Sequence, residues 1–295
     1  MKENIKSEKD KIKERKSICR LLNKNINTSE NLKQNKENCI IFMGISNINI
    51  GKLIVLNQLL NCNYKFIIGI DNKKYKNDND FNNDIKKNLD YIKKNLDNDL
   101  DNFLSIKKTY LDNNKLIKLY GNKIENFNGR WKDNPSKLGS IDWFNKSEYE
   151  YMWYLEDDVY CKNYNLFFDE YCDFKDDIIC KETETLPFWC KDNWRIGNKD
   201  HCFTHYFLCV TRYSKQFSNK FFKFLKQTKN TTHHELFIAY VLNYYHLNYR
   251  NLLEKHRKEL KMNGGKKNFY NLSDKDVNKN NAVIFHPFKI QEILK

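Results

Sequence analysis

Three consecutive acids, Glu156, Asp157 and Asp158, follow directly on the apolar and aromatic run Tyr151–Leu155. A buried strand that delivers carboxylates at its C-terminal end is how an open α/β sheet builds a site for a cation and for the phosphates that the cation carries. Adjacent carboxylates repel one another, and a metal or a hydrogen-bonded ligand would compensate their charge. The alternative interpretation is a solvated acidic turn after a core strand.

The chain of 295 residues carries a formal net charge of +14, with 52 basic residues of which only seven are Arg. An excess of Lys, Asn and Ile is what an AT-rich coding genome produces, so part of this charge reflects mutational bias. Clustered Lys can neutralise nucleic-acid phosphates, but base readout favours Arg, and the Lys residues here are interspersed with acids. Attraction of anionic substrates is equally consistent, and nucleic acid is not the expected partner.

The nine cysteines contain no C-x-x-C pair, so a zinc cluster is not expected. Residues 1–37 alternate Lys, Glu, Asn and Ser with sparse apolar residues, which predicts a flexible basic tail. We find no apolar segment of the length of a signal peptide or a membrane span. We therefore expect a cytoplasmic protein with reduced thiols.

The first half of the chain alternates predicted strands, which are short apolar runs, with predicted helices, which have apolar residues at steps of three and four. The strands are 39–45, 66–70 and 116–121, and the helices are 50–60, 85–103 and a segment from Asn134-Pro135 through Phe144. This last helix leads into the acidic strand, so the order is β-α-β-α-β-α-β. The economical fold is α/β, with a Rossmann-type, mostly parallel central sheet flanked by helices.

The second half of the chain is less regular. Its predicted elements are strands at 177–180, 205–211 and 282–285, a helix capped by Ser214, a buried helix at 233–247 and a polar excursion over 251–281. Residues 183–204 are predicted to form a long ordered loop, which either walls a binding cleft or merely caps the core.

The order of these elements resembles the nucleotide-diphospho-sugar transferase fold of GT-A glycosyltransferases. The resemblance is carried by a second strand that ends in Asp71, by the helix that contains Lys137 and above all by Leu155–Val159, where E-D-D stands in place of that family's D-x-D motif. This form, followed by a β-branched residue, is similar to that of N-acetylglucosaminyltransferases that act on protein glycans. The resemblance covers roughly residues 39–290.

The resemblance implies a single GT-A-like catalytic domain over 38–295, whose nucleotide-binding half runs to about residue 160 and whose acceptor-binding half covers 161–295. It also implies Mn²⁺ or Mg²⁺, because a divalent cation stabilises the charge that develops on a diphosphate leaving group. In the family the last acid of the motif binds the metal, which is Asp158 here. An earlier acid, Glu156 or Asp157, faces the ribose or a metal-bound water.

Three further residues acquire roles from the same resemblance. His286 follows the last strand, as does a C-terminal His that several GT-A enzymes bring back to the metal; otherwise it is a structural residue. Asp71 corresponds to a contact with the nucleoside base, or is an acid that starts a turn. Lys137 resembles a basic residue that many relatives aim at the nucleotide.

An inverting transfer needs a base for the acceptor hydroxyl, typically an acid at the start of a helix under the acceptor site. Glu235 occupies a matching position, with His234 as a fallback base. The competing interpretation is a capping box with Thr232, in which Glu235 only satisfies a backbone N–H. Four residues before the 205–211 strand could meet the acceptor sugar by stacking and hydrogen bonds. They are Asp192, Trp194, Arg195 and Asp200.

The sequence thus predicts an inverting, metal-dependent glycosyltransferase of the hexosyl- or N-acetylhexosaminyltransferase class. It would move a sugar from a nucleotide-diphosphate donor, with a UDP-sugar favoured, to a hydroxyl of a glycan, protein or small-molecule acceptor. One alternative is a metal-dependent phosphodiesterase or nuclease, in which the same acids with His286 would activate water. The other is a non-catalytic basic nucleic-acid-binding protein, whose salt-sensitive affinity would be unaffected by Asp158→Asn.

Overall fold

The computed structural model describes residues 38–71, 74–93, 106–111, 135–183, 205–228, 234–260 and 283–286. Its centre is a seven-stranded sheet in the order β3-β2-β1-β4-β7-β6-β8. The strands are β1 (Cys39–Ile45), β2 (Lys65–Asp71), β3 (Lys108–Leu111), β4 (Tyr151–Glu156), β6 (Ile178–Thr183), β7 (His205–Ser214) and β8 (Tyr249–Asn251). β7 pairs antiparallel with β4 and β6, and the other neighbouring pairs are parallel. The predicted mostly parallel α/β sheet is therefore confirmed.

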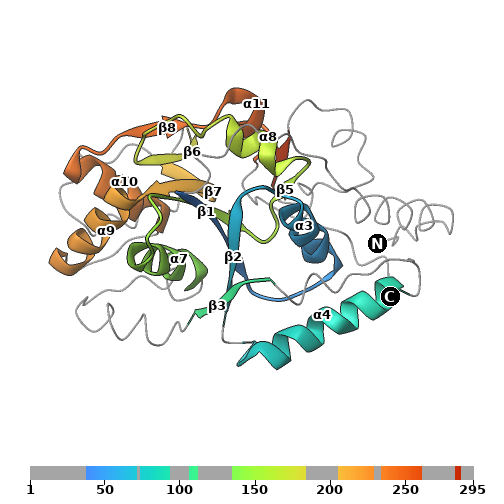
Figure 1. Ribbon diagram of the computed structural model, residues 1–295. Helices are drawn as coiled ribbons and strands as arrows, with labels where there is room; N and C mark the ends of the chain where they lie inside the picture. Colours follow the sequence, from blue (N-terminus) through green and yellow to red (C-terminus); the bar gives the residue numbers. More distant parts are fainter. Residues whose placement is uncertain are drawn as a thin grey trace, which may run out of the picture.

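Helices cover both faces of this sheet (Figure 1). On one face lie α3 (Ile50–Leu60), α4 (Asp78–Lys93) and α8 (Tyr164–Asp169), and on the other lie α7 (Pro135–Lys146), α9 (Lys215–Gln227) and α10 (His234–Tyr245). The short α11 (Glu254–Arg257) follows β8. Each face consequently has its own apolar core. None of the described helices combines the length and the hydropathy that a membrane crossing needs.

β4 lies in the middle of the sheet, between the parallel β1 and the antiparallel β7, and its side chains are buried on both faces. Met152 and Tyr154 belong to the core on the α7 side, whereas Trp153 and Leu155 belong to the core on the α3 side, and none of the four is more than 1% exposed. Strands of a parallel sheet that is covered on both faces have nearly continuous apolar runs. This explains why the run before the acids is recognisable in the sequence.

The carboxyl ends of β1, β2 and β4 meet at one edge of the sheet. Gly44 of β1 lies beside Glu156 of β4 on one side and beside Gly69 of β2 on the other. Because these three strands run parallel, the residues that follow them are gathered along the same edge. The acids and Asp71, the last residue of β2, therefore share that edge.

Polar side chains define the beginnings of two helices. The side chain of Asn49 accepts a hydrogen bond from the backbone N–H of Lys52 at 3.0 Å, which caps α3. The hydroxyl of Ser214 accepts one from the backbone N–H of Phe217 at 2.9 Å. The predicted N-cap of α9 is therefore confirmed, and it terminates the long strand β7.

The third strand differs from the prediction. The segment 116–121 lies outside the described residues. The strand that pairs with β2 is β3, which precedes that segment in the sequence. Three of its four residues are only partly buried, so it has no apolar run that periodicity could detect. The helix predicted at 85–103 already begins at Asp78 and is described as far as Lys93.

The other predicted elements agree to within a few residues, except where the chain is not described. The strand predicted at 177–180 is β6, and it extends to Thr183. The strand predicted at 205–211 is β7, which continues to Ser214, the N-cap of α9. The tail 1–37, most of the 183–204 loop and most of the 251–281 excursion lie outside the described residues.

Candidate metal centre at the carboxyl edge of the sheet

The first two of the three acids, the last residue of β4 and the residue after it, point to opposite faces of the sheet. Side chains alternate across a strand, and the preceding residues of β4 pack alternately on the α7 side and on the α3 side. Continuing this alternation, Glu156 meets Lys137 of α7, with 2.8 Å between Nζ and Oε1. Asp157 meets Lys52 of α3, with 2.5 Å between Nζ and Oδ2. Each carboxylate thus has its own lysine.

The pair Glu156–Lys137 joins a buried ammonium to a partly buried carboxylate. Burial by itself would raise the pKa of Glu156, but the charge of Lys137 and a hydrogen bond with His286 hold it well below its usual range. Burial would likewise lower the pKa of Lys137, yet Glu156, followed by Glu235, raises it above its ordinary value. A desolvated carboxylate with such partners keeps its charge, so Glu156 is available as an anionic ligand.

Asp157 is held against the loop between β1 and α3. Its Oδ2 accepts hydrogen bonds from the backbone N–H of Ser46 at 3.2 Å and from the Ser46 hydroxyl at 3.3 Å. Burial raises the pKa of Asp157 despite the attraction of Lys52. These contacts direct the side chain of Asp157 away from Glu156. The loop between β1 and α3, and not the neighbouring acids, therefore determines the position of Asp157.

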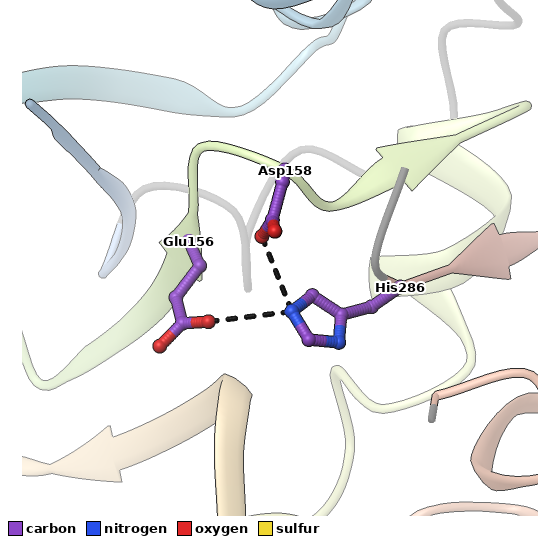
Figure 2. A group of neighbouring side chains, drawn as sticks. All are labelled: Glu156, Asp158 and His286. Carbon is purple, nitrogen blue, oxygen red and sulfur yellow. Dashed lines mark ion pairs between the residues drawn. The ribbon is translucent and has the colours of Figure 1, made fainter. Parts of the chain in front are cut away.

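A second, two-stranded sheet brings a distant histidine to the third acid. After Asp158 the chain enters β5 (Tyr160–Cys161), which pairs antiparallel with β9 (Ile284–Phe285). His286 follows β9 directly, and its Nε2 lies 3.1 Å from Asp158 Oδ1 and 3.4 Å from Glu156 Oε2. Figure 2 shows the imidazole placed between the two carboxylates. Only the fold brings His286 to the two acids, which lie two residues apart in the chain.

The backbone and a thiol also hold His286. Its backbone N–H donates to the carbonyl of Glu259 at 3.1 Å, and its ring forms a hydrogen bond with Cys209 of β7. Burial alone would lower the pKa of His286, but Cys209, Asp158 and Glu156 together raise it well above its usual value. Burial raises the pKa of Cys209, so its thiol is neutral and the charge that favours the imidazolium comes from the two carboxylates.

Glu156, Asp158 and His286 form a donor set that fits a divalent cation. Each offers one ligand atom, and these atoms lie within 4.8 Å of one another. Two ligands at right angles about a small divalent ion, at the bond length of about 2.1 Å, would be about 3 Å apart. The separations of 3.1 and 3.4 Å match this spacing. Two carboxylates with one imidazole suit Mn²⁺ or Mg²⁺ better than a thiolate-seeking metal.

The proposed base residues lie behind this centre. His234 and Glu235 open α10, and both are buried. Nε2 of His234 is 2.8 Å from Nζ of Lys137, and it is 4.0 Å from Oε1 of Glu235. Because an ammonium can only donate, the hydrogen bond makes this Nε2 an acceptor. Thr232, the partner in the alternative capping box, lies outside the described residues.

Of the remaining predicted site residues, Asp71 is separate from this cluster, Lys137 contacts one of its members, and the others are not described. Asp71 ends β2 at the same edge, and because β1 separates β2 from β4, it is displaced from the acids by about 10 Å, or two strand spacings. Lys137 is buried against Glu156, where the prediction aimed it at the nucleotide. The four predicted acceptor-binding residues lie outside the described residues. They are Asp192, Trp194, Arg195 and Asp200.

Three residues at the site were not predicted from the sequence. Lys52 and Ser46 fix Asp157, and the hydrogen-bond partner of the His286 ring is Cys209. The two residues of the β1–α3 segment could have been found from position, because the loop after the first strand of a parallel sheet ends at the same edge as the acids. No local pattern distinguishes Cys209 from the other cysteines of the chain.

Comparison with known proteins found neither a matching family model nor a matching curated protein. Among solved structures, mouse xyloside xylosyltransferase 1 in its apo form aligns with a TM-score of 0.44 and 12% sequence identity, over 84% of this chain and 96% of that chain. The 4-diphosphocytidyl-2C-methyl-D-erythritol synthase of Anaerococcus prevotii aligns with a TM-score of 0.39 and 9% identity, over 72% of this chain and 87% of that chain.

Proposed function

We propose that this chain is a metal-dependent glycosyltransferase that moves a sugar from a nucleotide-diphosphate donor to a hydroxyl acceptor. The observation that carries the proposal is the convergence of Glu156, Asp158 and His286 at the carboxyl edge of a mostly parallel sheet. Open α/β sheets bind their ligands outside the carboxyl ends of the strands. The arrangement therefore combines a cation site with the place where a phosphate-bearing ligand would bind.

The three residues would hold Mn²⁺ or Mg²⁺ through two oxygens and one nitrogen. When bound, such an ion supplies charge that stabilises the diphosphate as it leaves the sugar. The chain contributes the orientation of these ligands, because β4 fixes Glu156, the turn into β5 fixes Asp158, and the pairing of β5 with β9 fixes His286. Imidazole as a ligand favours Mn²⁺ over Mg²⁺.

Glu235 is the proposed general base for an inverting transfer. Of the two candidates at the start of α10, His234 already accepts a hydrogen bond at Nε2 from Lys137, so that nitrogen cannot take a proton from an acceptor hydroxyl. A carboxylate at Glu235 has the capacity to accept it. For the donor, Asp71 and Asp157 lie at the same edge of the sheet and are proposed to contact the nucleoside.

A panel of uridine and guanosine nucleotide sugars with Mn²⁺ tests the proposal. We expect slow donor hydrolysis, seen as release of the nucleoside diphosphate, with at least one sugar. Asp158→Asn should abolish this hydrolysis. Glu254→Gln, which changes an exposed acid of α11 that pairs with Lys258, should not. A nucleoside diphosphate should also raise the Tm of the chain when Mn²⁺ is present.

The same donor set would suit a phosphodiesterase, in which a metal-activated water attacks a phosphodiester. The nucleotide-sugar panel separates the two functions. Mn²⁺-dependent cleavage of an oligonucleotide by the parent chain, without hydrolysis of any uridine or guanosine donor, would favour the phosphodiesterase and overturn the transferase proposal.

A further inference from the structure

Lys137 lies at the centre of the polar network behind the candidate metal centre. It sits in the first turn of α7, and it is only 5% exposed. Its Nζ is 2.8 Å from Oε1 of Glu156 and 2.8 Å from Nε2 of His234. An ammonium so deeply buried is costly unless it is paired, so these contacts, with the charge of nearby Glu235, account for its presence in the interior.

The two oxygens of Glu156 have different partners. Oε1 faces Lys137, whereas Oε2 faces His286 at 3.4 Å and belongs to the cluster with Asp158. The ammonium therefore fixes the rotation of the carboxylate and leaves one oxygen for a cation. It also places a fixed positive charge within about 7 Å of the cation position, which is the reach of one carboxylate plus a hydrogen bond and a metal–oxygen bond.

We propose that Lys137 is the built-in counter-ion of the candidate metal centre, a positioning residue that preforms Glu156 for a divalent cation and at the same time limits how tightly that cation binds. The inference deepens the proposed function, because it rests on the same metal site. It replaces the nucleotide contact that the sequence predicted for this lysine, since the buried ammonium already faces Glu156 and His234. Through His234 it also ties the start of α10 to the metal centre.

The sign of the effect on metal affinity follows from the charges. Without the ammonium, the partly buried Glu156 would lose its lysine partner, and a divalent cation would be the obvious replacement. A like charge near a doubly charged ion in a partly desolvated site opposes binding strongly, whereas the hydrogen bond that orients Glu156 is a single contact. Removal of the ammonium should therefore destabilise the metal-free chain and tighten the binding of Mn²⁺.

The experiment compares the parent chain with Lys137→Met, which keeps the length of the side chain and removes its charge. Metal-free Tm, Tm at saturating Mn²⁺ and the Kd of Mn²⁺ by calorimetry are measured for each. We expect Lys137→Met to lower the metal-free Tm by about 10 °C, to regain much of this loss with Mn²⁺, and to bind Mn²⁺ about tenfold more tightly. Lys146→Met, at the exposed end of the same helix, is the matched control and should change none of the three quantities.

The double variant Lys137→Met/Glu156→Gln keeps the inference testable if the single variant does not fold. Removing both charges of the pair should restore at least half of the lost metal-free Tm, and a double variant that is no better than the single one would contradict the pairing. An unchanged or weaker Mn²⁺ affinity in Lys137→Met, with normal binding by the parent, would overturn the inference alone. A parent chain that binds no Mn²⁺ would overturn the metal site and the proposed function as well.

Discussion

Of the two neighbouring substitutions Asp157→Asn and Asp158→Asn, only the second should weaken metal binding. Asp158 Oδ1 lies 3.1 Å from Nε2 of His286, within the candidate donor set. Asp157 Oδ2 is instead occupied by Lys52 and Ser46 on the far side of the turn. The two changes are chemically identical and adjacent in sequence, so each serves as the control for the other.

The expected size of the difference can be worked out from the ligand count. A cation present at about 100 times its Kd stabilises the folded chain by about 2.7 kcal/mol, which corresponds to roughly 5–10 °C in Tm for a chain of this size. Loss of a residue that merely orients a metal ligand costs about 10- to 100-fold in affinity, so loss of Asp158 itself should cost at least about 100-fold. At the same Mn²⁺ concentration Asp158→Asn would gain only about 0.4 kcal/mol, or about 1 °C.

Thermal unfolding with and without Mn²⁺ measures this difference directly. Asp157→Asn should lower the metal-free Tm, because Lys52 loses its partner, and yet keep the Mn²⁺-induced rise. Asp158→Asn should lose most of that rise. If Asp157→Asn removed the rise while Asp158→Asn retained it, the cation would bind on the α3 face, and the assignment of Glu156, Asp158 and His286 as ligands would be refuted.

Two further predictions concern the scaffold. Nε2 of His256 is 2.7 Å from Oε2 of Glu170, and burial lowers the pKa of His256. The unfolded chain therefore binds the proton more readily, and stability falls as the pH drops below about 6.5. The Tm of His256→Phe should fall less than that of the parent between pH 7 and pH 5, and equal losses would contradict this. A Cβ on Gly69 would stand 2.3 Å from two ring carbons of Phe42, whereas one on Gly139 would meet the side chain of Leu111 at 3.0 Å or more. Gly69→Ala should cost about 1–3 kcal/mol in chemical denaturation, and a Gly139→Ala variant that was equally destabilised would show that the close approach to the ring is not the cause.

The fold was largely predictable because the parallel strands are covered on both faces. The runs that became β1, β2 and β4 are short, apolar and bounded by polar loops, and burial on both sides produces this pattern. β3 escaped prediction since it lies at the edge of the sheet, where partial burial permits the polar residues Lys108 and Thr109. Edge strands have weaker sequence patterns than central ones for this physical reason.

The candidate site was predictable only in part. Asp158 and His286 were paired in the sequence analysis by resemblance, but their contact depends on β5 and β9, strands of two residues each whose pairing joins distant parts of the chain. No local periodicity indicates such a short pairing. Lys52 was overlooked, and Lys137 was assigned to the nucleotide, for a different reason: in a chain so rich in lysine, composition cannot separate a lysine that is paired inside the protein from a solvated one.

The three consecutive acids after the apolar run of β4 differ in how their charge is compensated. Glu156 has Lys137, and Asp157 has Lys52, each within 2.8 Å. For Asp158 the ion-pair partner among the described residues is the imidazole of His286, which is a cation only while it carries a second proton. A neutral imidazole can bind a metal, and ligand deprotonation accompanies metal binding. Of the three carboxylates, Asp158 is therefore the one whose charge a divalent cation would compensate, on the side of the turn where Glu156 still offers an oxygen.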